Sequence, residues 1–269
     1  MSSRLTVWLG SGLLLLPLIS SLADDNPAQR VKQIVAHRGS SADRPENTLA
    51  STRRAIEVGA TAVEVDVRTT KDGVLVLSHD ATLDHATNGS GKINDKTLAE
   101  IQRFDAGSKF DPKFAGERVP TLEQVLTLCK GKIDVLLDLK ESGEQYDRRV
   151  AKMVKSISDP QRIIVGVRSV EQAKQFRKLL PKARQLGLIE KPAEIEVYVA
   201  AGVEMIRLWP KWLTDTSLVR RVRQAGVKLH LNGTTGSAEE VTELLKHRPD
   251  SLSSDDPARL IATLAELAK

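Results

Sequence analysis

The stretch TAVEVDVRTTKDGVLVLSHD, residues 61–80, holds two strand-like runs separated by a short link. Ala62–Arg68 and Val74–Ser78 are both rich in Val and Leu, and the link between them contains Asp72-Gly73, a strong hairpin signal. A parallel crossover needs about a dozen residues or more. We therefore expect Val74–Ser78 to be a hairpin arm that folds back on its neighbour and does not count among the strands of the main sheet.

Around this hairpin, short apolar runs alternate with helical patterns. The other expected strands are Gln33–His37, Ile133–Leu139, Arg162–Val167, Arg184–Ile189, Met205–Trp209, Val227–Leu231 and Ser251–Ser254. The expected helices are Asn47–Val58, Thr121–Cys129, Tyr146–Ser156, Val170–Leu180, Ala193–Ala201, Ser217–Gln224, Ala238–His247 and a short one within Asp95–Arg103. Such alternation predicts a parallel sheet. Eight strands besides the hairpin arm predict an α/β fold, a TIM-type (β/α)8 barrel.

Composition excludes several other classes of protein. The chain has 269 residues, of which 41% are hydrophobic, with a net charge of +5, so disorder is not expected. Its lone cysteine, Cys129, rules out an internal disulfide and is expected to be buried on an amphipathic helix. Lys and Arg do not cluster with aromatic residues, which argues against nucleic-acid binding. We expect one domain over residues 24–269, with 81–120 as a small inserted cap segment.

Residues 1–23 read MSSRLTVWLGSGLLLLPLISSLA, the three-part pattern of a signal peptide. Arg4 is the basic start, Leu5–Ile19 is largely apolar, and a small-residue site ends at Ala23. An uncleaved membrane anchor is the alternative, although the apolar run is short and is broken by Pro17. Cleavage after Ala23 predicts a periplasmic or secreted protein without stable membrane insertion.

Polar residues gather where the early strands end. They are His37, Arg38, Glu64, Asp66, His79, Asp138 and Lys140. In a parallel barrel these strand ends converge at one mouth, where active sites form. Glu64 and Asp66 are two residues apart on a strand, so they face the same side. Three carboxylates facing an apolar interior would need a cation, and their oxygens suit a hard divalent metal ion.

The remaining residues at this mouth add acid–base groups and positive charge. His37 and His79 suit a general acid and a general base, and Arg38 and Lys140 suit an anion such as phosphate. Taken singly, each has an ordinary structural alternative, such as a turn, an ion pair or a loop cap. Together they are the parts needed to cleave a phosphodiester.

Several motifs in this order resemble the glycerophosphodiester phosphodiesterases, here of a secreted bacterial type. They are His37-Arg38-Gly39, Pro45-Glu46-Asn47-Thr48, Glu64-Val65-Asp66-Val67, His79-Asp80, Asp138-Leu139-Lys140 and Ser254-Asp255-Asp256-Pro257. The resemblance implies a metal-dependent barrel enzyme that hydrolyses small glycerophosphodiesters to glycerol 3-phosphate and an alcohol, with no protein partner predicted. A phospholipase C- or D-like barrel acting on lipids and a non-catalytic phosphate-binding barrel are the alternatives.

The resemblance also implies a role for each matching residue. Those expected to bind one divalent cation, Ca²⁺ or Mg²⁺, are Glu64, Asp66 and Asp138. His37 and His79 would form the acid/base pair, while Arg38 and Lys140 would hold the phosphate. Asn47 could cap the following helix. The attacking group stays open between water and a neighbouring hydroxyl of the substrate.

Three positions depart from the family pattern. The family usually has Glu at Asp138 and Arg at His85. A late Trp motif is replaced by Leu231-Asn232-Gly233-Thr234, which leaves the choice of head group open. Trp209 and Trp212 are candidates for an apolar wall in its place, with core packing as the alternative.

Overall fold

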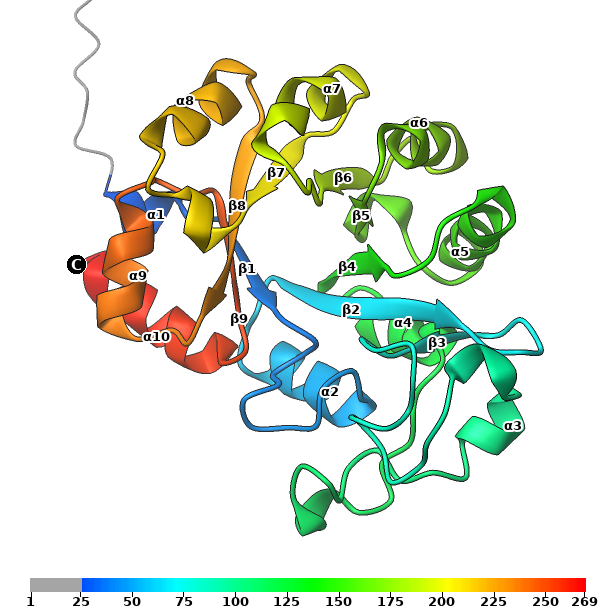
Figure 1. Ribbon diagram of the computed structural model, residues 1–269. Coiled ribbons are helices and arrows are strands. Elements are labelled where there is room, and N and C mark those ends of the chain that lie inside the picture. Colours follow the sequence, from blue (N-terminus) through cyan, green and yellow to red (C-terminus); the bar gives the residue numbers. More distant parts are fainter. Residues whose placement is uncertain (1–25) are drawn as a thin grey trace, which may run out of the picture.

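A closed parallel sheet of eight strands forms the centre of the protein, whose computed structural model describes residues 26–269 (Figure 1). The barrel strands are β1 Gln33–Ala36, β2 Ala62–Thr69, β4 Asp134–Leu139, β5 Ile163–Val167, β6 Arg184–Gly187, β7 Met205–Leu208, β8 Lys228–Thr234 and β9 Ser251–Ser254. Their order around the ring is β1-β9-β8-β7-β6-β5-β4-β2, and β2 pairs with β1 to close it. The predicted TIM-type barrel is confirmed.

The ninth strand, β3 (Leu75–Leu77), is the hairpin arm that the sequence predicts. It runs antiparallel to the end of β2, with Val67 opposite Leu77 and Thr69 opposite Leu75. Gly73 sits in the turn with φ +82°, a conformation that glycine adopts at little cost. The arm therefore extends β2 beyond the barrel and returns the chain to the mouth.

Helices surround the sheet. They are α1 Pro27–Arg30, α2 Leu49–Glu57, α3 Leu98–Ile101, α4 Leu122–Cys129, α5 Glu144–Ile157, α6 Val170–Leu179, α7 Ile195–Ala200, α8 Thr216–Gln224, α9 Ala238–Leu245 and α10 Pro257–Leu267. Short 3-10 turns lie at Ile93–Asp95, Pro112–Phe114, Pro160–Arg162, Pro192–Glu194 and Pro210–Trp212. Cys129 is buried on α4, as expected, whereas α1 and α10 are additions to the expected helices. Asp256 is the N-cap of α10, and its side chain accepts a hydrogen bond from the Arg259 amide.

Successive side chains of β2 point alternately to the helix layer and to the barrel axis, so apolar core residues alternate with residues of the polar cluster. Val63, Val65 and Val67 are fully buried in the layer between strands and helices. Glu64 and Asp66, one residue out of phase with them, face the barrel axis. Burying each of those valines stabilises the fold by about 1.5–3 kcal/mol, which holds the two acids in register.

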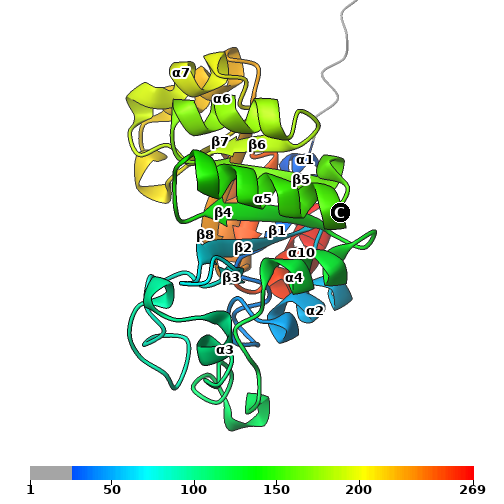
Figure 2. The same ribbon diagram turned by 90° about the vertical axis from the view of Figure 1, so that its right-hand side faces the viewer.

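Residues 81–120 form a lobe beside the barrel, next to β3 and α2 (Figure 2). Five apolar residues of the lobe pack together with Val76 of β3: Leu83, Ile93, Ile101, Ala106 and Val119. The carboxylate of Asp105 accepts hydrogen bonds from the amides of Ser108, Gly116 and Gly107. These bonds hold the pKa of Asp105 far below its ordinary value, so its charge fixes the loop at neutral pH.

The predicted signal peptide, residues 1–23, lies outside the described residues. Among residues 26–269, no helix combines the length and the apolar character that crossing a membrane requires.

Candidate active site

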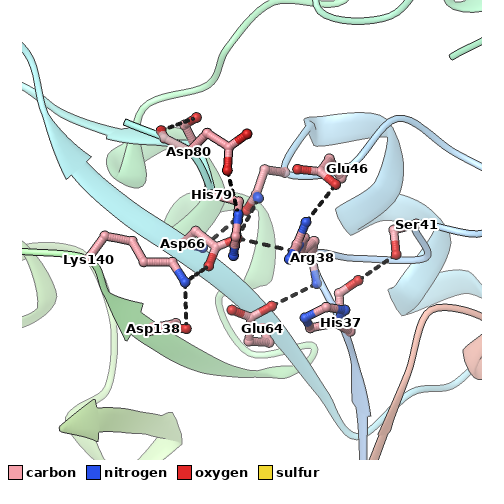
Figure 3. Close-up of polar contacts among 12 residues, drawn as sticks. His37, Arg38, Ser41, Glu46, Glu64, Asp66, His79, Asp80, Asp138 and Lys140 are labelled. Atoms are coloured by element: carbon pink, nitrogen blue, oxygen red, sulfur yellow. Dashed lines mark hydrogen bonds and ion pairs between the residues drawn. The ribbon is translucent and has the colours of Figure 1, made fainter. Parts of the chain in front are cut away.

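The three acids predicted from the sequence meet on neighbouring strands, Glu64 and Asp66 within β2 and Asp138 near the end of β4 (Figure 3). Asp66 and Asp138 are partners in the parallel register of these strands, and Glu64 precedes Asp66 by one pleat. One carboxylate oxygen from each of the three lies within 4.8 Å of the others, and all three residues are buried. The spacing follows directly from strand pairing.

The three buried carboxylates of this cluster lie close enough to repel one another, and a bound cation would relieve that repulsion. Burial, together with the charge of Asp66, raises the pKa of Glu64 to about 8. Lys140 Nζ lies 2.8 Å from Asp66 Oδ1 and 2.8 Å from Asp138 Oδ2, but the side chain of Glu64 has no cationic partner among the described residues. An all-carboxylate set fits a hard divalent cation such as Ca²⁺ or Mg²⁺.

Arg38 joins the loop after β1 to this cluster. Its backbone adopts φ +55°, which directs its N–H to Glu64 Oε2 at 2.8 Å. Its guanidinium donates to Glu46 Oε2 at 2.9 Å, while Nε lies 3.6 Å from Asp66 Oδ2 and makes no hydrogen bond. A left-handed arginine costs roughly 1–3 kcal/mol, and here it places a buried donor at the mouth.

Asn47 does not cap the following helix, contrary to the expectation from sequence. Thr48 is the N-cap of α2 and accepts a hydrogen bond from the Ser51 amide. Asn47 instead turns its side chain onto Asp66. Because this contact joins positions 19 residues apart, helix-start rules could not reveal it.

Each predicted histidine is paired with a carboxylate through Nδ1. His37 Nδ1 lies 2.6 Å from Asp255 Oδ1, and His79 Nδ1 lies 2.8 Å from Asp80 Oδ1. Burial lowers the pKa of His37, but the hydrogen bond to Asp255 and the charge of Glu64 outweigh it, so the pKa is raised. In both rings Nε2 is left for a ligand, as neither Nε2 bonds to any described residue.

The mouth opens into a cavity of 600 Å³, which is lined by six of the seven predicted residues: His37, Arg38, Asp66, His79, Asp138 and Lys140. Glu64 lines a smaller cavity of 40 Å³ toward the barrel interior, shared with His37 and Asp138.

The rest of the mouth is lined by Arg168, Arg207, Trp209 and Asn232. Of these, the sequence singled out Trp209 as a candidate apolar wall and Asn232 within the Leu231–Thr234 segment, but it singled out neither arginine. Arg168 Nη2 lies 2.6 and 2.9 Å from the two carboxylate oxygens of Asp138. Arg207 is a charged residue inside an otherwise apolar strand, a signal that was open to sequence analysis.

The two tryptophans divide between the roles considered for them. Trp209 lines the mouth, and the guanidinium carbon of Arg207 lies 4.1 Å from the centre of its ring. Trp212 packs against the core between strands and helices. Asn232, from the segment that replaces the family's Trp motif, also lines the mouth, whereas His85 lines a separate pocket beside Glu46.

The profile of the glycerophosphoryl diester phosphodiesterase family matches residues 37–259. The chain belongs to this family. A glycerophosphodiester phosphodiesterase from Caldanaerobacter subterraneus is 37% identical over 85% of this chain and 96% of the relative. One from Bacillus subtilis is 33% identical over 73% of this chain and 74% of the relative.

Solved structures of family members agree with the barrel. The glycerophosphodiester phosphodiesterase from Agrobacterium tumefaciens is 28% identical, covers 86% of this chain and 99% of its own, and superposes with a TM-score of 0.74. An Oleispira antarctica phosphodiesterase, solved with the product sn-glycerol 3-phosphate, is 25% identical. The match covers 89% of this chain and 99% of that one, with a TM-score of 0.79. The chain is a phosphoric diester hydrolase of the glycerophosphodiester phosphodiesterase type.

Proposed function

We propose that this phosphodiesterase hydrolyses soluble glycerophosphodiesters to sn-glycerol 3-phosphate and an alcohol, with His37 and His79 as the acid/base pair. One observation supports the proposal. Two histidines paired with carboxylates, the side chains of Arg38 and Lys140, and the acidic cluster lie together at one mouth of the barrel. The substrate class is supported by the names of the relatives and by the product bound to the Oleispira antarctica enzyme.

Arg38 and Lys140 bind the phosphate in this scheme. Arg38 Nε is a buried donor without a hydrogen bond, and an anionic oxygen at the mouth would satisfy it. Lys140 lies between Asp66 and Asp138 and presents a compact positive charge to the same region. Together they orient the phosphoryl group and offset its charge.

Glu64, Asp66 and Asp138 would hold the divalent cation. When bound, such an ion polarises a phosphoryl oxygen and stabilises the charge that develops on it. Asp138 is already held by Lys140 and Arg168, so its carboxylate is oriented before any ligand arrives.

We assign His37 as the general acid and His79 as the general base. The raised pKa of His37 keeps its ring protonated closer to neutral pH, which suits a proton donor. His79 takes the proton from the attacking hydroxyl, which belongs to water or to the neighbouring carbon of the glycerol arm. The bond from phosphorus to the leaving oxygen breaks, and His37 Nε2 supplies the proton that this oxygen needs.

Leaving-group chemistry tests the assignment. A nitrophenolate leaves without a proton, whereas an alkoxide requires one. His37→Ala is therefore expected to lose about 100-fold in kcat/KM with glycerophosphoethanolamine and much less with a nitrophenyl phosphodiester of glycerol. His79→Ala is expected to impair both substrates alike. The reverse pattern would exchange the two roles, and full activity of both variants would reject the mechanism.

A second experiment tests the metal and the product. Chelation with EDTA should abolish release of glycerol 3-phosphate, and Ca²⁺ or Mg²⁺ should restore it in the wild type. Asp66→Asn is the matched variant, because it keeps the side-chain volume but removes a charge from the cluster. Turnover that survives both EDTA and Asp66→Asn would rule out the metal site.

We also propose that the enzyme works in the periplasm or outside the cell. The tripartite sequence of residues 1–23 supports export, and a buried Cys129 is compatible with an oxidising compartment. Fractionation of producing cells, with mass spectrometry of the N-terminus, tests this. A mature chain beginning at Asp24 is expected, and an intact N-terminus in the cytoplasm would refute export.

A further inference from the structure

Arg207 is a buried cation that forms no ion pair with any residue in the described part of the chain. The residue is only 8% exposed, and its Nε is buried without a hydrogen bond. None of the ion pairs among residues 26–269 includes it. Its guanidinium carbon lies 4.1 Å from the centre of the Trp209 ring, which cannot neutralise a charge, and the carboxylates of Asp138 and Glu64 act on it only through space, without an ion pair.

The position of Arg207 places it across the mouth from the phosphate-binding residues. In the ring order, β7 lies four strands from β2 in either direction, so Arg207 and the Glu64–Asp66 pair occupy opposite walls. The same 600 Å³ cavity reaches both walls. A diester with its phosphate beside Arg38 and Lys140 can extend one arm toward β7.

An anion is the ligand that best compensates this residue. Burial lowers the pKa of Arg207 to about 10, which still leaves it charged at neutral pH. A buried charge without a partner is costly, and a carboxylate or phosphate meets a guanidinium with two parallel hydrogen bonds. Arg168, which also lines the mouth, already has Asp138 as its ion-pair partner, whereas Arg207 lacks an ion pair and is the arginine still able to bind an anion directly.

A second buried polar group without a hydrogen-bond partner indicates what else the ligand carries. Asn232 Oδ1 is buried without a hydrogen-bond donor and lines the same cavity. A donor at Arg207 and an acceptor at Asn232 match an arm that carries both a carboxylate and an ammonium group.

We propose that Arg207, with Trp209 and Asn232 beside it, forms a subsite for an anionic group on the alcohol arm of the substrate. The preferred substrates are then glycerophosphodiesters of carboxylate-bearing alcohols, of which glycerophosphoserine is the test case. The inference rests on the proposed function and adds the class of head group to it.

Glycerophosphoserine and glycerophosphoethanolamine differ only by the serine carboxylate, so they form a matched pair. The wild type should favour glycerophosphoserine by about tenfold in kcat/KM. In Arg207→Met this ratio should fall to about one, mainly through a loss with glycerophosphoserine. Arg220→Met, a change at an exposed position of α8, is the control and should keep the wild-type ratio.

Each outcome decides between the proposals. Turnover of both diesters with equal efficiency by the wild type overturns the subsite but leaves the proposed function intact. An equal loss with both diesters in Arg207→Met assigns Arg207 to the phosphate or to the fold, and it also overturns the subsite. No turnover of any diester by folded, metal-loaded enzyme contradicts the proposed function and the subsite with it.

Inhibition of the wild type supplies a measurement that does not depend on the variant folding. O-phosphoserine should inhibit hydrolysis more strongly than O-phosphoethanolamine, again by about tenfold. Equal inhibition by the two compounds would overturn the subsite even if Arg207→Met cannot be purified.

Discussion

Asn47 and Asp66 exchange two hydrogen bonds across 19 residues of sequence. Asn47 Nδ2 donates to Asp66 Oδ2 at 2.7 Å, and the Asp66 amide donates to Asn47 Oδ1 at 3.1 Å. Asn47 holds φ +54°, a conformation that asparagine tolerates better than most residues. The loop after β1 therefore fixes one acid of the cluster through both its backbone and its side chain.

Asn47→Ala should destabilise the protein by about 1–3 kcal/mol, because the buried amide of Asp66 loses its acceptor. Divalent cation binding should weaken as well, since the Asp66 carboxylate loses the contact that orients it. Urea unfolding and metal titration measure the two effects. Asn47→Asp is the matched comparison, as it keeps the acceptor but brings a second negative charge to Asp66. Wild-type metal affinity in both variants would contradict the orienting role.

Glu64→Gln should stabilise the metal-free enzyme while it abolishes metal binding. The folded-state pKa of Glu64, about 8, lies above its ordinary 4.5, so this group costs stability as pH rises from about 4.5 to 8. The neutral amide avoids that cost, and we expect a gain of about 2 kcal/mol at pH 7 in EDTA. Urea unfolding at pH 5 and pH 7.5 should show the gain growing with pH. A constant difference would mean that Glu64 does not titrate in this range.

Asp255→Asn should shift the pH profile of turnover. The hydrogen bond and charge of Asp255 raise the pKa of His37, so their loss lowers it. With His37 as the general acid, activity on the alkaline side should decline about one pH unit earlier than in the wild type. Profiles of kcat/KM from pH 5 to 10 provide the measurement, and Asp95→Asn, at an exposed position of the lobe, is the control. If the low-pH side of the kcat/KM profile shifted instead, His37 would be the general base.

Arg168→Met should destabilise the metal-free protein by about 1–2 kcal/mol at pH 7, a figure reduced because Arg168 is partly exposed. Burial raises the pKa of Asp138, but Lys140 and Arg168 outweigh it and hold the pKa low. Because the carboxyl pKa of Asp138 is lower in the folded than in the unfolded protein, the ionised group stabilises the fold at pH values above its unfolded-state pKa. That stabilisation is lost as the pH falls through the folded-state pKa. The difference should therefore shrink toward pH 3.

The comparison for this prediction is Arg148→Met, which removes an exposed i,i+4 pair with Glu144. It should cost about 0.3–0.5 kcal/mol at pH 7. If both arginine variants have the same effect, the Asp138 pair contributes no more than a surface pair.

Cys129 should be unreactive until the protein unfolds. Burial raises the pKa of its thiol to about 12, so the reactive thiolate is scarce and covered. Labelling with an aromatic disulfide should follow the urea unfolding curve. Rapid labelling of the native enzyme would show that α4 opens locally.

The alternation of strands and helices along the sequence was sufficient to predict the barrel, and the polar residues on the early strands were sufficient to predict seven residues near its mouth. Glu64 and Asp66 could be placed because strand periodicity is a property of neighbouring residues, and β3 because its link is short. Arg168 could not be placed, because it follows a strand with no motif around it and meets Asp138 across 30 residues. The role of Asp255 was equally hidden, since pairing with His37 requires that the barrel close.

That closure also sets when the enzyme can first work. β1 is held between β2, through two residue pairs, and β9, which carries the chain to Asp255. His37 and its partner are 218 positions apart, so the ribosome delivers the histidine long before the carboxylate that raises its pKa. A chain moved across a membrane before it folds would assemble this pair only on the far side. The architecture thus makes the full pairing of His37 wait for the last strand of the barrel to join the first.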